Sequence, residues 1–241
     1  MNALTITLRL LFLLCITILL ITTNARWAIN DIRLYEYEFN RYGISQDTGL
    51  EKEQLLYVGK QIQDYFNAVD TTPLDVRLSS QNGELDLFTQ TEVLHMHDVK
   101  ELVRTTYRVQ EGALLYLILF SLMGLLTKGK PFLRILLQGT RLGSVMVLAI
   151  VAIASILSSV AFSQIFYLFH LAGFRNVLWQ LDPTKHYLIR IFPEGFFFDF
   201  TLFIGGASAL EAIALLVLTW AWSRYVRIRE DRRVAAAPYL S

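Results

Sequence analysis

Four long apolar stretches, separated by polar segments, organise this chain. They cover residues 4–23, 112–127, 142–169 and 200–222, and Arg9 is the one charge that interrupts the first. A helix needs about 20 mostly apolar residues to cross a bilayer. The pattern therefore predicts a mainly α-helical integral membrane protein with four transmembrane helices.

The first stretch has two interpretations. Its uninterrupted apolar core at residues 10–21 has the length of a signal-peptide core, and Thr23-Asn24-Ala25 loosely resembles a cleavage site. The apolar residues before Arg9, together with the weak positive region ahead of the core, favour a retained membrane anchor. Under both interpretations the following segment is expected on the outer side of the membrane.

Basic residues are concentrated in two of the polar segments. The segment 128–141 has no acidic residue, and the tail 223–241 begins with a run of arginines; the residues are Lys128, Lys130, Arg134, Arg141, Arg224, Arg227, Arg229, Arg232 and Arg233. Short loops rich in lysine and arginine stay in the cytoplasm. Both termini are therefore predicted to be cytoplasmic, with segments 24–111 and 170–199 outside.

The two outer segments differ in character. Segment 24–111 is predicted to form an extracytoplasmic domain, with helical spacing of apolar residues at 50–67 and 88–107. Segment 170–199 is dense in Phe, Trp and Tyr with interspersed charges, which is typical of the headgroup region. It is predicted to lie along the outer interface.

Composition supports a membrane protein and gives no sign of nucleic-acid binding. The 241 residues are 54% apolar and only 18% charged, with a net charge of +1. Soluble domains have about 25% charged residues, and a net charge near zero gives no general attraction to nucleic acid. The single cysteine, Cys15, lies in the first apolar stretch and cannot form a disulfide within the chain.

Four histidines, His95, His97, His170 and His186, lie in or beside the outer segments. Histidine is the side chain that most readily moves protons near neutral pH. In a helix over 90–107, Glu92, His95 and Asp98 share one face, while His97 points about 200° away from His95. A neighbouring carboxylate fixes the tautomer of an imidazole and raises its basicity.

Less specific interpretations remain open for these residues. Each histidine could be an interfacial hydrogen-bonding anchor, and the face of Glu92, His95 and Asp98 could be a solvated one. A zinc site built with His97 would require a strand or irregular backbone at 95–97, since positions i and i+2 diverge on a helix. No metal and no cofactor are expected.

Several strings in the sequence resemble one bacterial family. LFTQTEVLHMHDVKELV, FHLAGF and FPEGFFFD, with Trp179 and Asp182-Pro183, resemble the four-span membrane family that contains the lipoprotein intramolecular transacylase. The resemblance covers nearly the whole chain. Its specific parts are Phe169-His170 and the pattern E-x-x-H-M-x-D-V, which is matched by Glu92, His95, Met96, Asp98 and Val99.

The resemblance implies a set of functional residues. Two histidines are implicated in the activity of that enzyme, and they correspond to His95 and His170. Glu92 and Asp98 are expected to support them, while His97 falls on a variable position and receives no role. Contacts with substrate are expected from Asn176, Trp179 and Asp199.

The resemblance also implies a reaction. An ester-linked acyl chain would move from the diacylglyceryl group of a lipoprotein to the amine of its N-terminal cysteine, leaving a lyso-lipoprotein. His95, oriented by Asp98 or Glu92, would deprotonate the amine and His170 would stabilise the oxyanion or the leaving alcohol, although these roles could be exchanged. The partners would be diacylated lipoproteins and lipid of the bacterial cytoplasmic membrane.

One alternative belongs to a different functional class. A non-catalytic member of the same family would bind lipid or a protein partner through its outer domain. Catalysis requires the two imidazoles to lie within about one substrate group of each other, whereas binding does not. The sequence gives no oligomeric state.

Overall fold

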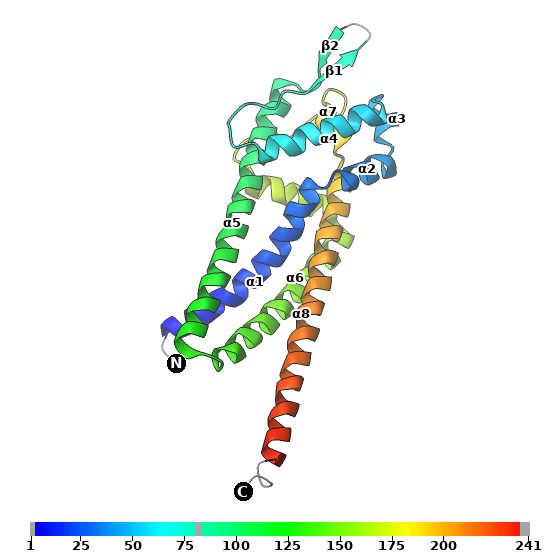
Figure 1. Cartoon of the computed structure of the whole chain (residues 1–241). Helices are drawn as coiled ribbons and strands as arrows, with labels where there is room; N and C mark the ends of the chain where they lie inside the picture. Colours follow the sequence, from blue (N-terminus) through cyan, green and yellow to red (C-terminus); the bar gives the residue numbers. More distant parts are fainter. Residues whose placement is uncertain (1–2, 81–82, 237–241) are drawn as a thin grey trace. The chain divides into compact units, whose positions relative to one another are not determined.

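The protein contains four helices that are long and apolar enough to cross a membrane. The computed structural model describes residues 3–80 and 83–236. The long helices are α1 (Ala3–Asn30), α5 (Gln90–Lys128), α6 (Phe132–Gly173) and α8 (Glu194–Ala236), shown in Figure 1. The predicted fold class, a mainly α-helical protein with four membrane-spanning helices, is confirmed.

These helices extend beyond the apolar stretches. The predicted helix at 88–107 and the stretch 112–127 belong to the single helix α5, since one Gly112 is not enough to end a helix. Much of the segment 128–141 is helical as well, because α6 begins at Phe132. The turn between α5 and α6 contains Gly129 with a left-handed backbone (φ 63°), which suits a helix end. The last part of the predicted tail, 237–241, lies outside the described residues.

The helix α6 is not regular throughout. Ala161 has non-helical angles (φ −146°, ψ 40°), and the helix is kinked there. A kink of this kind interrupts the ladder of backbone hydrogen bonds. The last part of α6, which carries His170, therefore follows its own direction.

The chain is built from two compact units. The first takes in described residues of the ranges Met1–Ile21, Gln110–Ala152 and Gly206–Ser241, and the second consists of Thr22–Val109 and Ile153–Gly205. All of the site residues predicted from the sequence belong to the second unit.

Close helix contacts hold the first unit together. A Cβ on Gly139 of α6 would lie 2.6 Å from the ring of Phe12 in α1, so the glycine allows this close approach. Arg141 of α6 donates through Nη2 to the carbonyl oxygen of Thr219 (2.6 Å) and to the hydroxyl of Ser223 (2.5 Å) in α8. These bonds give the charged guanidinium group of Arg141 hydrogen-bond partners inside a largely apolar unit.

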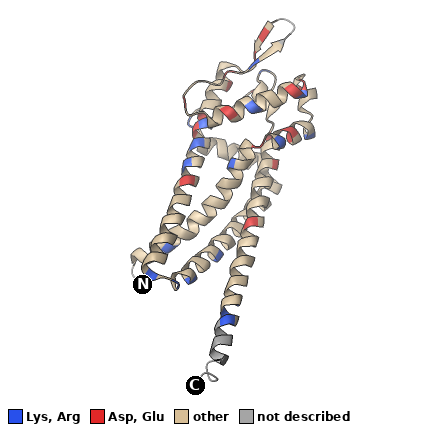
Figure 2. Ribbon diagram, in the orientation of Figure 1, with Lys and Arg blue, Asp and Glu red and all other residues tan. Residues whose placement is uncertain are grey.

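The second unit adds short elements to the ends of the long helices. These are α2 (Ile32–Arg41), α3 (Ile44–Thr48), α4 (Lys52–Asn67), α7 (Tyr187–Ile191) and an antiparallel hairpin of β1 (Arg77–Ser80) with β2 (Gly83–Asp86), in which Leu78 pairs with Leu85. The helix predicted at 50–67 is α4, and it begins with a capping box of Glu51 and Gln54. In the ribbon of Figure 2, many residues coloured as charged lie on α2–α4 and the hairpin, whereas long stretches of the four long helices are coloured as uncharged.

Two contacts position the amino-terminal half of α5, which carries His95. Arg104 donates to the carbonyl oxygen of Ala68 (2.7 Å), and Lys100 donates to that of Asp70 (3.1 Å), directly after α4. Cations stabilise the carboxyl end of a helix because its last carbonyl groups lack intrahelical partners. The end of α4 is thereby fixed to α5.

An aromatic cluster joins α2 to the beginning of α8. The ring of Tyr35 lies edge-to-face with Phe39 and with Phe192, Phe196 and Phe200, at centroid distances of 5.5–6.2 Å. This arrangement is favourable for aromatic quadrupoles. The cluster is part of the main apolar core of the second unit.

Candidate active site

Two histidines that are distant in sequence lie next to each other in the second unit. The ring centroids of His95, on α5, and His170, near the end of α6, are 6.1 Å apart. Two hydrogen bonds to one reacting centre span about 5–6 Å between their outer atoms. The separation therefore suits two imidazoles that act on the same small group.

His170 is held in a defined orientation. Its Nδ1 lies 2.7 Å from the carbonyl oxygen of Phe166, one turn earlier in α6. Since a carbonyl oxygen can only accept a hydrogen bond, Nδ1 carries the proton. In the neutral ring, Nε2 then presents a free lone pair. The rings of Phe166 and Trp179 lie against the imidazole at 4.5 and 5.1 Å.

His95 has a different environment. The residue is only 7% exposed, and its Nδ1 is buried without a hydrogen-bond partner among the described residues. It lies in the polar half of α5, where burial and then the neighbouring His170 lower the pKa of His95 to about 4, with Asp98 opposing the shift. His95 is therefore a neutral imidazole at pH 7.

Asp98 is linked to the loop after α6 rather than to His95. Asn176 donates through Nδ2 to Asp98 (2.8 Å). The backbone carbonyl oxygen of Asn176 accepts from Nε1 of Trp179 (2.9 Å). The carboxylate of Asp98 thereby holds the loop that places Trp179 beside His170. That Asp98 orients His95 stays a prediction. Its electrostatic effect on His95 remains.

Glu92 caps the beginning of α5. The residue is 0% exposed, and one carboxylate oxygen accepts from the backbone N–H (2.7 Å) and the hydroxyl (2.8 Å) of Thr89. The other oxygen accepts from the backbone N–H of Leu188 in α7 (2.7 Å). The hydrogen bonds of the Glu92 carboxylate go to Thr89 and Leu188, and the buried Nδ1 of His95 has no partner among the described residues. These bonds fix the first turn of α5, three residues before His95, and support of His95 by Glu92 stays a prediction.

Asp199 lies in a separate polar cluster. It accepts from the hydroxyl of Tyr42 (2.8 Å) and forms an ion pair with Arg41 (3.0 Å), both from α2. Trp179 lies against His170 and Asn176 bonds to Asp98, whereas the contacts of Asp199 connect α8 to α2. A contact of Asp199 with substrate stays a prediction.

Comparison with known proteins decides the family. Residues 10–197 match the model of the family described as lipoprotein intramolecular transacylase Lit. The chain belongs to this family. Members of the Lit family are acyltransferases, and this member is a multi-pass membrane protein. No match was found among curated proteins.

Solved structures share the fold of this Lit family member. The membrane integral lipoprotein intramolecular transacylase Lit from Bacillus cereus is 19% identical, with a TM-score of 0.71 over 97% of this chain and 100% of that chain. Variants of the same protein in which a histidine is replaced by arginine or alanine both have TM-scores of 0.69, at 20% and 19% identity. They cover 92% of this chain and 93% and 94% of their own.

The two remaining histidines of this Lit family member, His97 and His186, make local contacts. The side chain of His97 is 50% exposed and lies 4.0 Å from Asp98. Residues 95–97 are helical, so the irregular backbone that a zinc site would need there is not present. His186 accepts through Nδ1 from the backbone N–H of Asp182 (2.9 Å) within a turn. Among the described residues, no group of three metal-binding side chains comes together.

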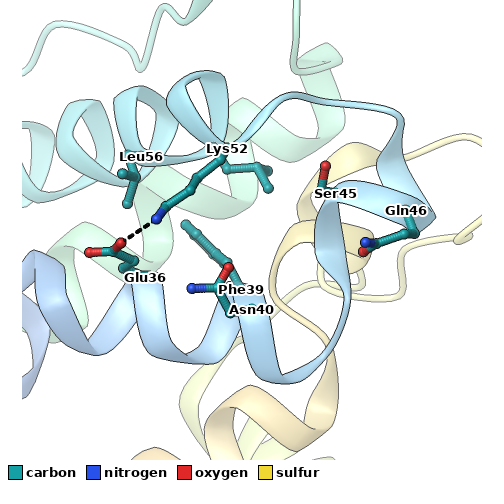
Figure 3. Close-up of a pocket in the computed structure, with 8 residues that line it drawn as sticks. Glu36, Phe39, Asn40, Ser45, Gln46, Lys52 and Leu56 are labelled. Carbon is teal, nitrogen blue, oxygen red and sulfur yellow. Dashed lines mark ion pairs between the residues drawn. The ribbon is translucent and has the colours of Figure 1, made fainter.

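A small pocket lies away from the two histidines. Figure 3 shows this pocket among α2, α3 and α4, where Lys52 and Glu36 form an ion pair of 2.6 Å. Its volume is about 80 Å³, and none of the site residues predicted from the sequence lines it. A pocket of this size accommodates a few water molecules rather than an acyl chain.

Two aromatic residues of the site were not predicted. Phe166 supplies the carbonyl that orients His170, and Phe174 lies against both His95 (5.1 Å) and His170 (5.5 Å). Both are four residues from His170, on the same side of α6 or just after its end. That i±4 spacing was the available signal.

Replacing Gly195 by alanine is expected to disturb the cluster around Asp199. A Cβ at this position, in the first turn of α8, would lie 2.4 Å from the ring of Tyr42 and would displace it from Asp199. Overpacking of this kind costs about 1–3 kcal/mol, so the melting temperature of the solubilised protein should fall by several degrees. Gly206→Ala in the same helix, where nothing lies within 4 Å of the added Cβ, is the control and should not lower it. Equal melting temperatures for the two variants would contradict this expectation.

Proposed function

We propose that this chain moves an ester-linked acyl chain from the diacylglyceryl group of a lipoprotein to the α-amine of its N-terminal cysteine, with His95 and His170 as the catalytic pair. The observation that carries the proposal is the approach of the two imidazoles to 6.1 Å among aromatic side chains, in a member of a transacylase family. The amine nitrogen attacks the ester carbonyl carbon. The carbon–oxygen bond to glycerol then breaks, an amide forms and the proton lost by the amine passes to the glycerol oxygen.

His170 is assigned the role of general base. With its Nδ1 proton bound to the carbonyl of Phe166, Nε2 can accept a proton from the attacking amine and return it to the leaving oxygen. An α-amine has a pKa of about 8, so a base must hold its neutral form during attack.

His95 is assigned the stabilisation of the oxyanion. A neutral imidazole donates a hydrogen bond without carrying a charge into the site, and the unpartnered Nδ1 of His95 is available for such a bond. These assignments exchange the two roles that the sequence first suggested.

The surroundings of the pair favour transfer over hydrolysis. Phe166, Phe174 and Trp179 present apolar surface to His170, which suits an acyl chain and leaves little room for competing water. Because the ester and the amine belong to one substrate molecule, their proximity is already supplied. No covalent intermediate with the enzyme is required.

The location of the reaction follows from the distribution of charge. Lys128, Lys130 and Arg134 near the turn between α5 and α6, and the arginines at the end of α8, support cytoplasmic termini in a bacterial cytoplasmic membrane. The domain at 24–111 and the loop at 170–199 then lie on the outer side. The histidines would meet the ester and amine of a lipoprotein at the outer lipid interface.

The activity can be measured directly on a lipoprotein. The chain is expressed in cells that lack their own N-acylating enzymes, and the N-terminal lipopeptide of a reporter lipoprotein is examined by mass spectrometry. We expect an N-acylated lyso-form of the same total acyl content as the diacylated substrate. Unchanged diacylated lipoprotein, with the protein present in the membrane, would reject the function and favour the non-catalytic alternative.

A further inference from the structure

Glu38 is a buried carboxyl group outside the histidine site. It lies on α2, is only 4% exposed, and its Oε2 has no hydrogen-bond partner among the described residues. A buried polar atom without a partner costs about 1–3 kcal/mol. The arrangement therefore calls for a partner that the heavy atoms alone do not reveal.

Glu38 shares one face of α2 with Arg41 and Tyr42, which follow it by three and four residues, and both of these contact Asp199 of α8. This places Asp199 on the side of α2 that carries Glu38. Asp199 already accepts from the hydroxyl of Tyr42 (2.8 Å) and pairs with Arg41 (3.0 Å). Two ionised carboxylates can only accept hydrogen bonds, so they would repel each other, and the single Arg41 would face two negative charges. A proton on one of the carboxyl groups removes both problems.

We propose that Glu38 and Asp199 share one proton, and that the resulting hydrogen bond between a carboxylic acid and a carboxylate holds α2 against the beginning of α8. The proton resides on Glu38, and the carboxylate of Asp199 accepts from it. When the proton is lost to solvent, two like charges remain in a buried space and the junction weakens. The proposal is independent of the acyl-transfer activity.

The electrostatic surroundings agree with this assignment. Burial is the largest cause of the raised pKa of Glu38, and the neighbouring Asp199 is the next. Together they raise this pKa to about 7, whereas Arg41 opposes the shift. Ion pairs engage charged groups on two other elements next to α2. Lys52 of α4 pairs with Glu36, and Asp47 of α3 pairs with Arg190 of α7.

The direction of the pH effect follows from the raised pKa. The folded state binds the proton more tightly than the unfolded chain, in which Glu38 has its ordinary value near 4.5. The stabilisation is complete below that ordinary value and is lost as the pH rises through about 7. The wild-type protein should therefore lose on the order of 5 °C in melting temperature between pH 5 and pH 8 relative to a variant without this proton.

Glu38→Gln supplies that variant, because its amide can donate to Asp199 at every pH. Thermal unfolding of the solubilised full chain is followed from pH 5 to pH 8 for the wild type, Glu38→Gln and the control Glu36→Gln. The control removes an exposed carboxylate from the same helix and should keep the wild-type pH dependence, whereas Glu38→Gln should flatten it. An unchanged slope in Glu38→Gln would overturn the proposal.

Infrared spectroscopy provides a test that does not rely on the variant's stability. A protonated carboxylic acid has a carbonyl stretch that a carboxylate lacks. The wild-type protein at pH 6 should show this band, and it should be lost when the pH is raised to 8.5. If Glu38→Gln folds, it should lack the band at pH 6, while Glu36→Gln should retain it. Absence of the band in the wild type, or its persistence in Glu38→Gln, would also overturn the proposal.

Discussion

Replacing His170 by alanine is expected to abolish acyl transfer. The change removes the imidazole whose Nε2 is made available by the bond between Nδ1 and the carbonyl of Phe166. Loss of a positioned general base lowers rates by about 10²–10⁴. The measurement is the rate at which the purified protein converts a synthetic diacylated lipopeptide into its lyso-form, followed by mass spectrometry.

His95 provides the comparison that separates the two roles. His95→Ala should also lose about 10²–10³ in rate, because an oxyanion donor is removed. His95→Gln keeps an N–H donor and should retain more activity than His170→Gln, in which no base remains. The exposed His97 is the control, and His97→Ala should act near the wild-type rate. Equal inactivity of the two glutamine variants would contradict the assigned roles, and an active His170→Ala would exclude this residue as the base.

Replacing Glu92 by alanine should produce a large loss of stability. Its fully buried carboxylate accepts from two donors of Thr89 and from the backbone N–H of Leu188, and these donors would lose their partner. The buried N–H of Leu188 left without a partner costs about 1–3 kcal/mol. The donors of the exposed Thr89 can turn to water, but the lost cap at the beginning of α5 costs about 1 kcal/mol more. A total of about 3 kcal/mol is therefore expected. For a protein of this size the melting temperature should fall by roughly 6–12 °C.

Glu101→Ala is the matched control for this prediction. Glu101 lies on the same helix, and its exposed side chain forms an ion pair of 3.5 Å with Arg104. Exposed pairs contribute at most about 1 kcal/mol, so the control should melt within 2–3 °C of the wild type. If Glu92→Ala melts as the control does, the capping role of Glu92 is wrong.

The sequence predicted the four apolar helices and singled out the two histidines that the structure brings together, because each depends on a local signal. An apolar run of sufficient length has few alternatives to a membrane helix, and His95 and His170 lie in strings typical of one family. The continuity of α5 was less evident, since the change from charged to apolar residues near 111 resembles a boundary although no strong helix breaker occurs there.

The partners of the carboxyl groups could not be predicted from the sequence. Glu92 and Asp98 do share the helical face of His95, but the Leu188 N–H and the Asn176 amide compete for them from segments far along the chain. Helical spacing indicates which side chains are neighbours on one element and gives no information about donors that arrive from another. The proposed pairing of Glu38 with Asp199 could not be predicted for the same reason.

The bond between Glu92 and Leu188 has a consequence for biosynthesis. It connects residues 96 positions apart, and the later one follows both histidines in the chain. During translation, the first turn of α5 must wait for α7 before its buried carboxylate is fully satisfied. A nascent chain that already contains both histidines therefore still lacks the hydrogen bond that fixes the helix turn before His95. Acyl transfer should begin only after Leu188 has been synthesised.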